Sequence, residues 1–217
     1  MPARTRDWVI AVLAAALFMA ACGGSDDDAD DSGRSSTAAD EETSTTQPAA
    51  SDPAVVRPYI EDLLASWDEA MTPILGDPQA VADDPEHPLR ADLAESFTEE
   101  SPYIEDLSNL LEGYISQDTG LLPGPTGLVQ QTTFLEFTRT PDDDHVSFVF
   151  CTFTDGVDFS LSTGEERPST VGVRQGAGDA ARVDGRWLLD QLQRLGFEEH
   201  PAGTPNPCPD LAAPDEG

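Results

Sequence analysis

Lysine is absent from this chain of 217 residues, in which eleven arginines face 42 acidic residues and the formal net charge is −31. Proteins that coat DNA or RNA need clustered cations, so this composition excludes that class. It also argues against docking to an anionic lipid surface through basic side chains. Aromatic residues make up 7% of the chain, so we expect part of it to lack a folded core. The length suits one ordinary domain with accessory segments.

Sequence motifs of known chemistry are also missing. The chain has no nucleophile elbow, no zinc motif and no dinucleotide-binding fingerprint. Gly172, Gly176 and Gly178 lack the strand–turn–helix context that a phosphate-binding loop needs. The three histidines, at positions 87, 145 and 200, are far apart and stand beside acids or prolines. The sequence therefore predicts no metal, no cofactor and no catalytic set.

The N-terminus has the pattern of an export signal. Arg4 and Arg6 precede an uncharged apolar run at residues 8–21. A helix of that length reaches about 21 Å, which is short of the roughly 30 Å hydrocarbon core of a bilayer. Residues 1–21 are therefore interpreted as a signal peptide rather than a transmembrane anchor.

The residues at the end of this run sharpen that interpretation. Met19-Ala20-Ala21-Cys22 resembles a bacterial lipobox, with methionine where leucine is usual. The resemblance implies a diacylglycerol on Cys22, which becomes the new N-terminus. Acyl chains contribute about 0.8 kcal/mol per buried methylene, so the lipid would hold the protein on the outer face of the cell membrane. The alternative is an ordinary secretory signal in which Cys22 is incidental.

An acidic tether is expected at residues 22–52. From residue 23 onward it has nine acids, one arginine and no large apolar side chain, so it has nothing to bury and should be disordered. Its aspartate block lacks the spacing and the turn glycine of a calcium loop. We interpret it as a solvated spacer.

Helices are predicted first in the remaining chain. Residues 57–72 carry an apolar stripe at three- and four-residue spacing, and Pro73 is expected to end that helix. A shorter helix is expected over residues 89–97, opened by Pro88. Ser101-Pro102 is typical of the start of a third helix.

Strands are predicted after residue 125. The candidates are rich in Thr, Phe and β-branched residues and cover residues 130–140, 146–154, 159–163, 170–175, 181–183 and 186–189. Asp184-Gly185 is a strong signal for a two-residue hairpin turn. Helices followed by antiparallel strands indicate an α+β fold, with the helices packed on one face of a curved sheet.

This order, with the stretch VDGRWLLD at residues 183–190, resembles the nuclear transport factor 2-like (cystatin-like cone) superfamily, and in particular its lipid-anchored, secreted members without assigned activity. The resemblance implies a cone-shaped domain over residues 53–199, followed by a Pro-rich tail at residues 200–217. It also implies a cavity between helices and sheet, which some relatives use for isomerase or dehydratase chemistry.

The chain has three cysteines, an odd number for an exported protein. If Cys22 carries lipid, Cys151 and Cys208 are the remaining pair, and a disulfide between them would pin the tail across the sheet. The alternative is two free thiols. A metal site is a weaker interpretation, because no histidine stands at ligand spacing.

Candidate pocket residues follow from the helical stripes. The side chains expected nearest a cavity are Tyr59, Trp67, Tyr103 and Tyr114, although core packing explains them equally well. Glu136 is either a buried acid or a solvent-facing strand residue. Asp190 is ambiguous in the same way, and His145 beside three aspartates is explained by turn chemistry.

Together these observations favour a membrane-anchored, non-enzymatic binding module for an unknown protein or a small apolar ligand. One alternative is an isomerase- or dehydratase-type enzyme with a buried acid in the cone, and another is a structural spacer. The Phe-rich strand at residues 146–154 also suggests a homodimer through the open sheet face.

Overall fold

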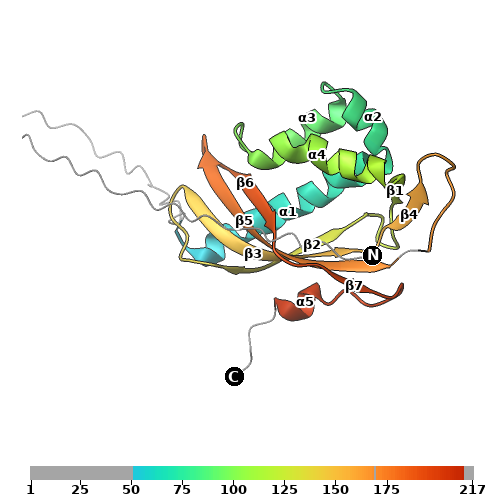
Figure 1. Cartoon of the computed structure of the whole chain (residues 1–217). Coiled ribbons are helices and arrows are strands. Elements are labelled where there is room, and N and C mark those ends of the chain that lie inside the picture. Colours follow the sequence, from blue (N-terminus) through green and yellow to red (C-terminus); the bar gives the residue numbers. More distant parts are fainter. Residues whose placement is uncertain (1–50, 169, 213–217) are drawn as a thin grey trace, which may run out of the picture. The chain divides into compact units, whose positions relative to one another are not determined.

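The computed structural model describes residues 51–168 and 170–212, so the predicted signal peptide, Cys22 and nearly all of the predicted tether lie outside the described residues. In chain order its elements are α1 (Pro53–Gly76), α2 (Pro78–Asp83), α3 (Pro88–Ala94), α4 (Pro102–Ser116), β1 (Thr119–Leu122), β2 (Gln131–Phe137), β3 (His145–Thr154), β4 (Val157–Ser160), β5 (Val171–Val183), β6 (Arg186–Arg194), β7 (Glu198–His200) and α5 (Cys208–Leu211) (Figure 1). No helix among these is both long and apolar enough to cross a bilayer.

Each of the first four helices begins with a proline, where the missing N–H costs no hydrogen bond. The Asp52 side chain accepts a hydrogen bond from the N–H of Ala54 and caps α1. The prediction that Pro73 ends this helix is wrong, because α1 continues to Gly76. Ile74 and Leu75 are buried in the core, and their packing offsets the one backbone hydrogen bond that the proline removes.

Strands β2, β3, β5 and β6 form an antiparallel sheet in that order, and β7 pairs with the beginning of β5. The prediction of two separate strands at residues 170–175 and 181–183 is wrong, since β5 is continuous over thirteen residues. The two glycines between the predicted strands pair directly with β3, Gly176 opposite Phe150 and Gly178 opposite Phe148. The predicted turn is confirmed: Asp184 and Gly185 have φ angles of 50° and 81° and connect β5 to β6.

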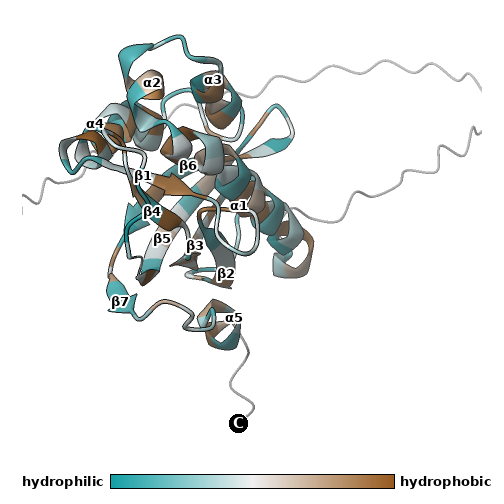
Figure 2. Cartoon of the chain, turned by 90° about the vertical axis from the view of Figure 1, so that its right-hand side faces the viewer, coloured by the Kyte–Doolittle hydropathy of each residue, from teal (hydrophilic) through white to brown (hydrophobic). Residues whose placement is uncertain are grey.

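The helices cover one face of this sheet, and the main core lies between them (Figures 1 and 2). A Cβ atom on Gly176 or Gly178 would collide with the ring of Phe150 or Phe148. The two glycines therefore let these rings lie over the neighbouring strand. Both rings are buried together with Trp67 of α1, so aromatic side chains fill the middle of the concave face.

The opposite face of the sheet carries a smaller core under the C-terminal tail. The predicted disulfide is confirmed: Cys151 in β3 is bonded to Cys208 in α5. Both cysteines are fully buried and pack with Phe153, Val171 and Val173. Figure 1 places α5 on the side of the sheet away from the helices.

A second, two-stranded sheet joins β1 to β4. Asp118, just before β1, organises the loop that follows β4. Its carboxylate accepts hydrogen bonds from the Ser160 hydroxyl and the Ser162 backbone, and forms an ion pair of 2.8 Å with Arg167. The pKa of Asp118 is lowered, chiefly by the Ser160 hydrogen bond.

Candidate functional site

The interior between helices and sheet, where a cavity was expected, contains one buried acid that the sequence analysis missed. Asp68 lies on α1 and is 3% exposed. Its carboxylate accepts hydrogen bonds from the Gln130 side chain at 2.9 Å and from the Thr132 hydroxyl at 2.8 Å, and another from the Thr132 backbone N–H. Burial raises the pKa of Asp68 from 3.8 to about 6, and the three hydrogen bonds limit that rise.

These hydrogen bonds give Asp68 a structural role. Both of its oxygens are used, and they attach the start of β2 to α1. A nearby hydrogen bond, from the Val129 backbone to the Thr72 hydroxyl, joins the same two segments. A shifted pKa at a buried acid is a common sign of a functional site, but it also marks structural acids. Here the carboxylate is already occupied by the protein.

The sequence contained a signal for Asp68. It lies four residues after Leu64 and three before Met71, so it occupies the apolar stripe of α1. A charged residue at a core position of an amphipathic helix needs a partner elsewhere. Its partners come from more than sixty residues further along the chain, and helical periodicity does not identify them.

Trp67 and Tyr103, two predicted pocket residues, lie together in the core. The Trp67 indole donates a hydrogen bond to the Tyr103 hydroxyl at 3.0 Å, and the Tyr103 ring stacks on Phe97 with centroids 5.0 Å apart. The Tyr103 hydroxyl is also 3.6 Å from the sulfur of Met71. Burial raises the pKa of Tyr103 to about 12. The two side chains thus satisfy each other's polar groups.

Little space is left beside this network. A cavity lined by Trp67, Tyr114, Phe150, Thr152 and Arg174 has a volume of about 10 Å³. That is about the lower limit for holding one water molecule. This cavity is therefore too small to hold an organic substrate.

The other sequence candidates lie apart from one another. Glu136 is solvent-exposed on strand β2, so it is not a buried acid. Asp190 accepts a hydrogen bond of 2.7 Å from the Thr98 hydroxyl. His145 lies 2.7 Å from an Arg139 guanidinium nitrogen and 3.8 Å from the Asp179 carboxylate. The structure brings none of these three into one cavity with a tyrosine. Across residues 51–168 and 170–212, no group of three His, Cys, Asp or Glu side chains is placed to hold a metal ion.

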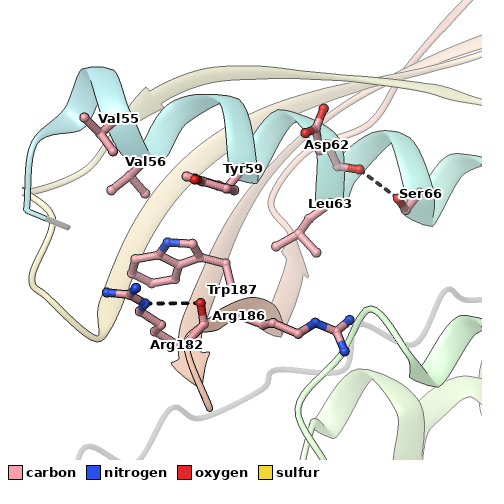
Figure 3. A pocket seen from close by; sticks show the side chains of 10 residues that line it. Val55, Val56, Tyr59, Asp62, Leu63, Ser66, Arg182, Arg186 and Trp187 are labelled. Carbon is pink, nitrogen blue, oxygen red and sulfur yellow. Dashed lines mark hydrogen bonds between the residues drawn. The ribbon is translucent and has the colours of Figure 1, made fainter. Parts of the chain in front are cut away.

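Tyr59 lines an open groove at the hairpin end of the domain, which we call the α1–hairpin groove (Figure 3). Its volume is about 330 Å³, and its lining residues come from α1 and the β5–β6 hairpin: Val55, Val56, Tyr59, Asp62, Leu63, Ser66, Arg182, Gly185, Arg186 and Trp187. In Figure 3 the Tyr59 ring and the Trp187 indole lie on opposite sides of the groove. Tyr59 is 52% exposed, whereas Trp187 is 8% exposed.

The rim of the α1–hairpin groove is polar. Arg182 donates a weak hydrogen bond of 3.4 Å to the Gly185 carbonyl, whereas the Arg186 side chain extends in the opposite direction (Figure 3). Asp62 lies on the α1 side. An apolar groove with aromatic side chains and a few charged groups at its edge suits a small aromatic or aliphatic ligand.

Comparisons with known proteins give distant structural similarities and no activity. No protein-family model and no curated protein matches the chain. Among solved structures, a type 2 hexachlorocyclohexane dehydrochlorinase is 14% identical, covers 75% of this chain and 96% of its own, and has a TM-score of 0.41. A putative scytalone dehydratase from Novosphingobium aromaticivorans is 14% identical, with 70% and 96% coverage and a TM-score of 0.39. A protein of unknown function with a cystatin-like fold from Nostoc punctiforme is 10% identical, with 65% and 90% coverage and a TM-score of 0.31.

At these identities and TM-scores, the activities of those proteins say nothing about this one. The architecture comes from the chain itself: N-terminal helices, then antiparallel strands, with the helices on one face of the sheet. The α+β fold predicted from the sequence is therefore confirmed. This chain has an antiparallel sheet with helices packed on one of its faces.

Proposed function

We propose that this protein is a lipid-anchored, extracytoplasmic binding module that takes a small apolar ligand in the α1–hairpin groove. The observation that carries the proposal is that the exposed Tyr59 and the largely buried Trp187 both line a groove of about 330 Å³. An exposed tyrosine opposite an indole offers flat apolar area at little entropic cost. The filled interior leaves the surface as the place for a ligand.

The location rests on the lipobox-like residues that end in Cys22. A diacylglycerol on Cys22 would tether the domain outside the cell through the acidic segment that follows. Replacing Cys22 with Ala should release the protein from membranes or stall its processing. Retention of a fully processed Cys22→Ala protein in the membrane fraction would contradict the anchor.

An isomerase or dehydratase has less support. Such an enzyme needs an acid or a histidine facing the substrate in an enclosed pocket. Asp68 is buried, but its oxygens already accept hydrogen bonds from Gln130 and Thr132. The cavity that its partner Gln130 lines is too small for an organic molecule.

The groove is tested with 2-naphthol, a neutral aromatic probe, and the mature chain (residues 22–217 with Cys22→Ala). We expect saturable quenching of tryptophan fluorescence and a roughly fivefold weaker affinity in Tyr59→Ala, since one aromatic contact is worth about 1 kcal/mol. Tyr114→Ala is the matched control, because Tyr114 is a helical tyrosine outside this groove. Equal affinities of the wild type and Tyr59→Ala would contradict the proposal.

A further inference from the structure

A second groove lies at the other end of β5 and β6. Its lining comes from α4, β1, β5 and the chain around β7, and its volume is about 440 Å³. We call it the arginine groove and define it by Tyr114, Thr154, Arg174, Arg194 and Phe197. Within the described residues it shares no lining residue with the α1–hairpin groove, so it is a separate site.

Arg174 and Arg194 enter this groove without acidic partners. In the part of the chain that the structure describes, the ion pairs formed by arginine are Arg57–Glu61 and Arg167–Asp118. Neither Arg174 nor Arg194 has a carboxylate within 4.0 Å, although acids outnumber arginines almost fourfold in the chain. Two neighbouring cations without a carboxylate in direct contact repel each other unless an anion joins them.

Arg174 is held in place and is incompletely hydrogen-bonded. Its guanidinium lies 4.7 Å from the centre of the Phe197 ring, and that ring lies against Gly172, where a Cβ would collide with it. The Nε atom of Arg174 is buried and has no hydrogen-bond partner among the described residues. Burial, and then the charge of Arg194, lower the pKa of Arg174. An unpaired buried N–H of this kind calls for an acceptor.

The surroundings restrict the kind of anion. Asp158 and Glu199 line the same groove, and the Thr170 hydroxyl donates to Glu199 at 2.6 Å. These carboxylates, together with the overall charge of −31, would repel a ligand with two or more negative charges. Phe197 and Leu121 supply apolar surface beside the guanidinium groups.

We propose that Arg174 and Arg194 bind the carboxylate of a small organic acid with a single negative charge. A planar guanidinium matches the two oxygens of a carboxylate, so the ligand would supply the missing acceptor and relieve the repulsion between the two cations. Its apolar part would lie against Phe197. The proposal is independent of the α1–hairpin groove and survives if that groove binds nothing.

The test uses benzoate, its neutral analogue benzamide and the dianion terephthalate, added at fixed ionic strength to the mature chain (residues 22–217 with Cys22→Ala) labelled with ¹⁵N-arginine. Benzoate should shift the Nε signals of Arg174 and Arg194 saturably, benzamide should leave them in place, and terephthalate should bind more weakly. Arg194→Gln should weaken benzoate binding at least tenfold. Arg139→Gln is the matched control, because Arg139 is exposed on another part of the surface.

Three results would overturn the proposal. Equal shifts with benzamide would mean that only the apolar surface binds. Tighter binding of terephthalate would indicate a site for polyanions. If Arg194→Gln bound benzoate with unchanged affinity and had the same unfolding midpoint as the wild type, the arginine pair would not be the binding site. Arg174→Gln provides a second variant if Arg194→Gln fails to fold.

Discussion

On the helix-facing side of the β5–β6 pair, the side chains in the middle are packed in the core, whereas those at the two ends line open grooves. In the middle, Gly176 and Gly178 let the rings of Phe150 and Phe148 lie across the strand, and these rings pack in the core with Trp67. At the hairpin end, Trp187 faces Tyr59 across an open groove. At the other end, Arg174 and Arg194 line another groove. The core behind this strand pair is filled, and open grooves lie at both of its ends and between α4 and β6.

The largest expected losses of stability come from substitutions in the filled core or in the smaller core on the outer face of the sheet. Phe150→Ala should lower the free energy of unfolding by about 3–5 kcal/mol, because it removes a fully buried ring and leaves a cavity. The matched control is Phe197→Ala, which truncates a phenylalanine that is 56% exposed and should cost about 1 kcal/mol or less. Chemical denaturation measures both. Equal losses of unfolding free energy in the two variants would mean that Phe150 is not part of a tightly packed core.

Removal of the disulfide tests the outer face. The bond joins residues 57 positions apart, and opening a loop of that size costs about 4 kcal/mol in the chain-entropy model. Cys151→Ser combined with Cys208→Ser should therefore lower the melting temperature markedly, and reduction of the wild type should do the same. An unchanged midpoint after verified reduction would show that the bond does not stabilise the domain.

Asp68 gives a pH dependence with a defined sign. Its pKa is about 6 in the folded protein and 3.8 in the reference state, so the folded state binds the proton more tightly. This contribution to stability is fully present below about pH 4 and is lost as the pH rises through about 6, by about 3 kcal/mol. Asp68→Asn should lack that decline when urea unfolding is measured between pH 4 and pH 7. The same decline in the wild type and in Asp68→Asn would mean that a group other than Asp68 causes it.

The smallest expected effect on stability is at the hairpin end. Tyr59→Ala should change the free energy of unfolding by no more than about 0.5 kcal/mol, because the side chain is 52% exposed and makes no side-chain hydrogen bond within the described residues. Tyr103→Ala is the contrast, since that ring is stacked on Phe97 and bonded to Trp67, and it should cost about 3 kcal/mol or more. A large loss in Tyr59→Ala would mean that this tyrosine holds the core together rather than lining a ligand site.

Local patterns predicted much of the fold. The stripe of α1, the proline at the start of α4 and the Asp184-Gly185 turn depend on residues close together in the sequence, and each appears in the structure. The disulfide between Cys151 and Cys208 was predictable by counting, once Cys22 was set aside. The continuity of β5 was not predictable, because its glycines are explained by rings on the neighbouring strand β3.

The candidate sites were less predictable, since they depend on long-range partners. Glu136 and His145 were natural candidates in the sequence, yet the buried acid is Asp68, whose partners Gln130 and Thr132 belong to another element. Tyr59 and Tyr114 were expected near a single cavity and line two different grooves. Arg174 and Arg194 come together only through the pairing of β5 with β6.

One spectrum tests the central claim that the core around Trp67 is filled and that ligands bind in the grooves at the two ends of the β5–β6 pair. In a ¹H–¹⁵N spectrum of the uniformly labelled mature chain, the Trp67 indole reports on the interior and the Trp187 indole on the α1–hairpin groove, while the Arg174 Nε reports on the arginine groove. We predict that 2-naphthol shifts Trp187, that benzoate shifts Arg174, and that neither moves Trp67. A saturable shift of Trp67 with either probe would show that ligands enter the interior and would contradict the account.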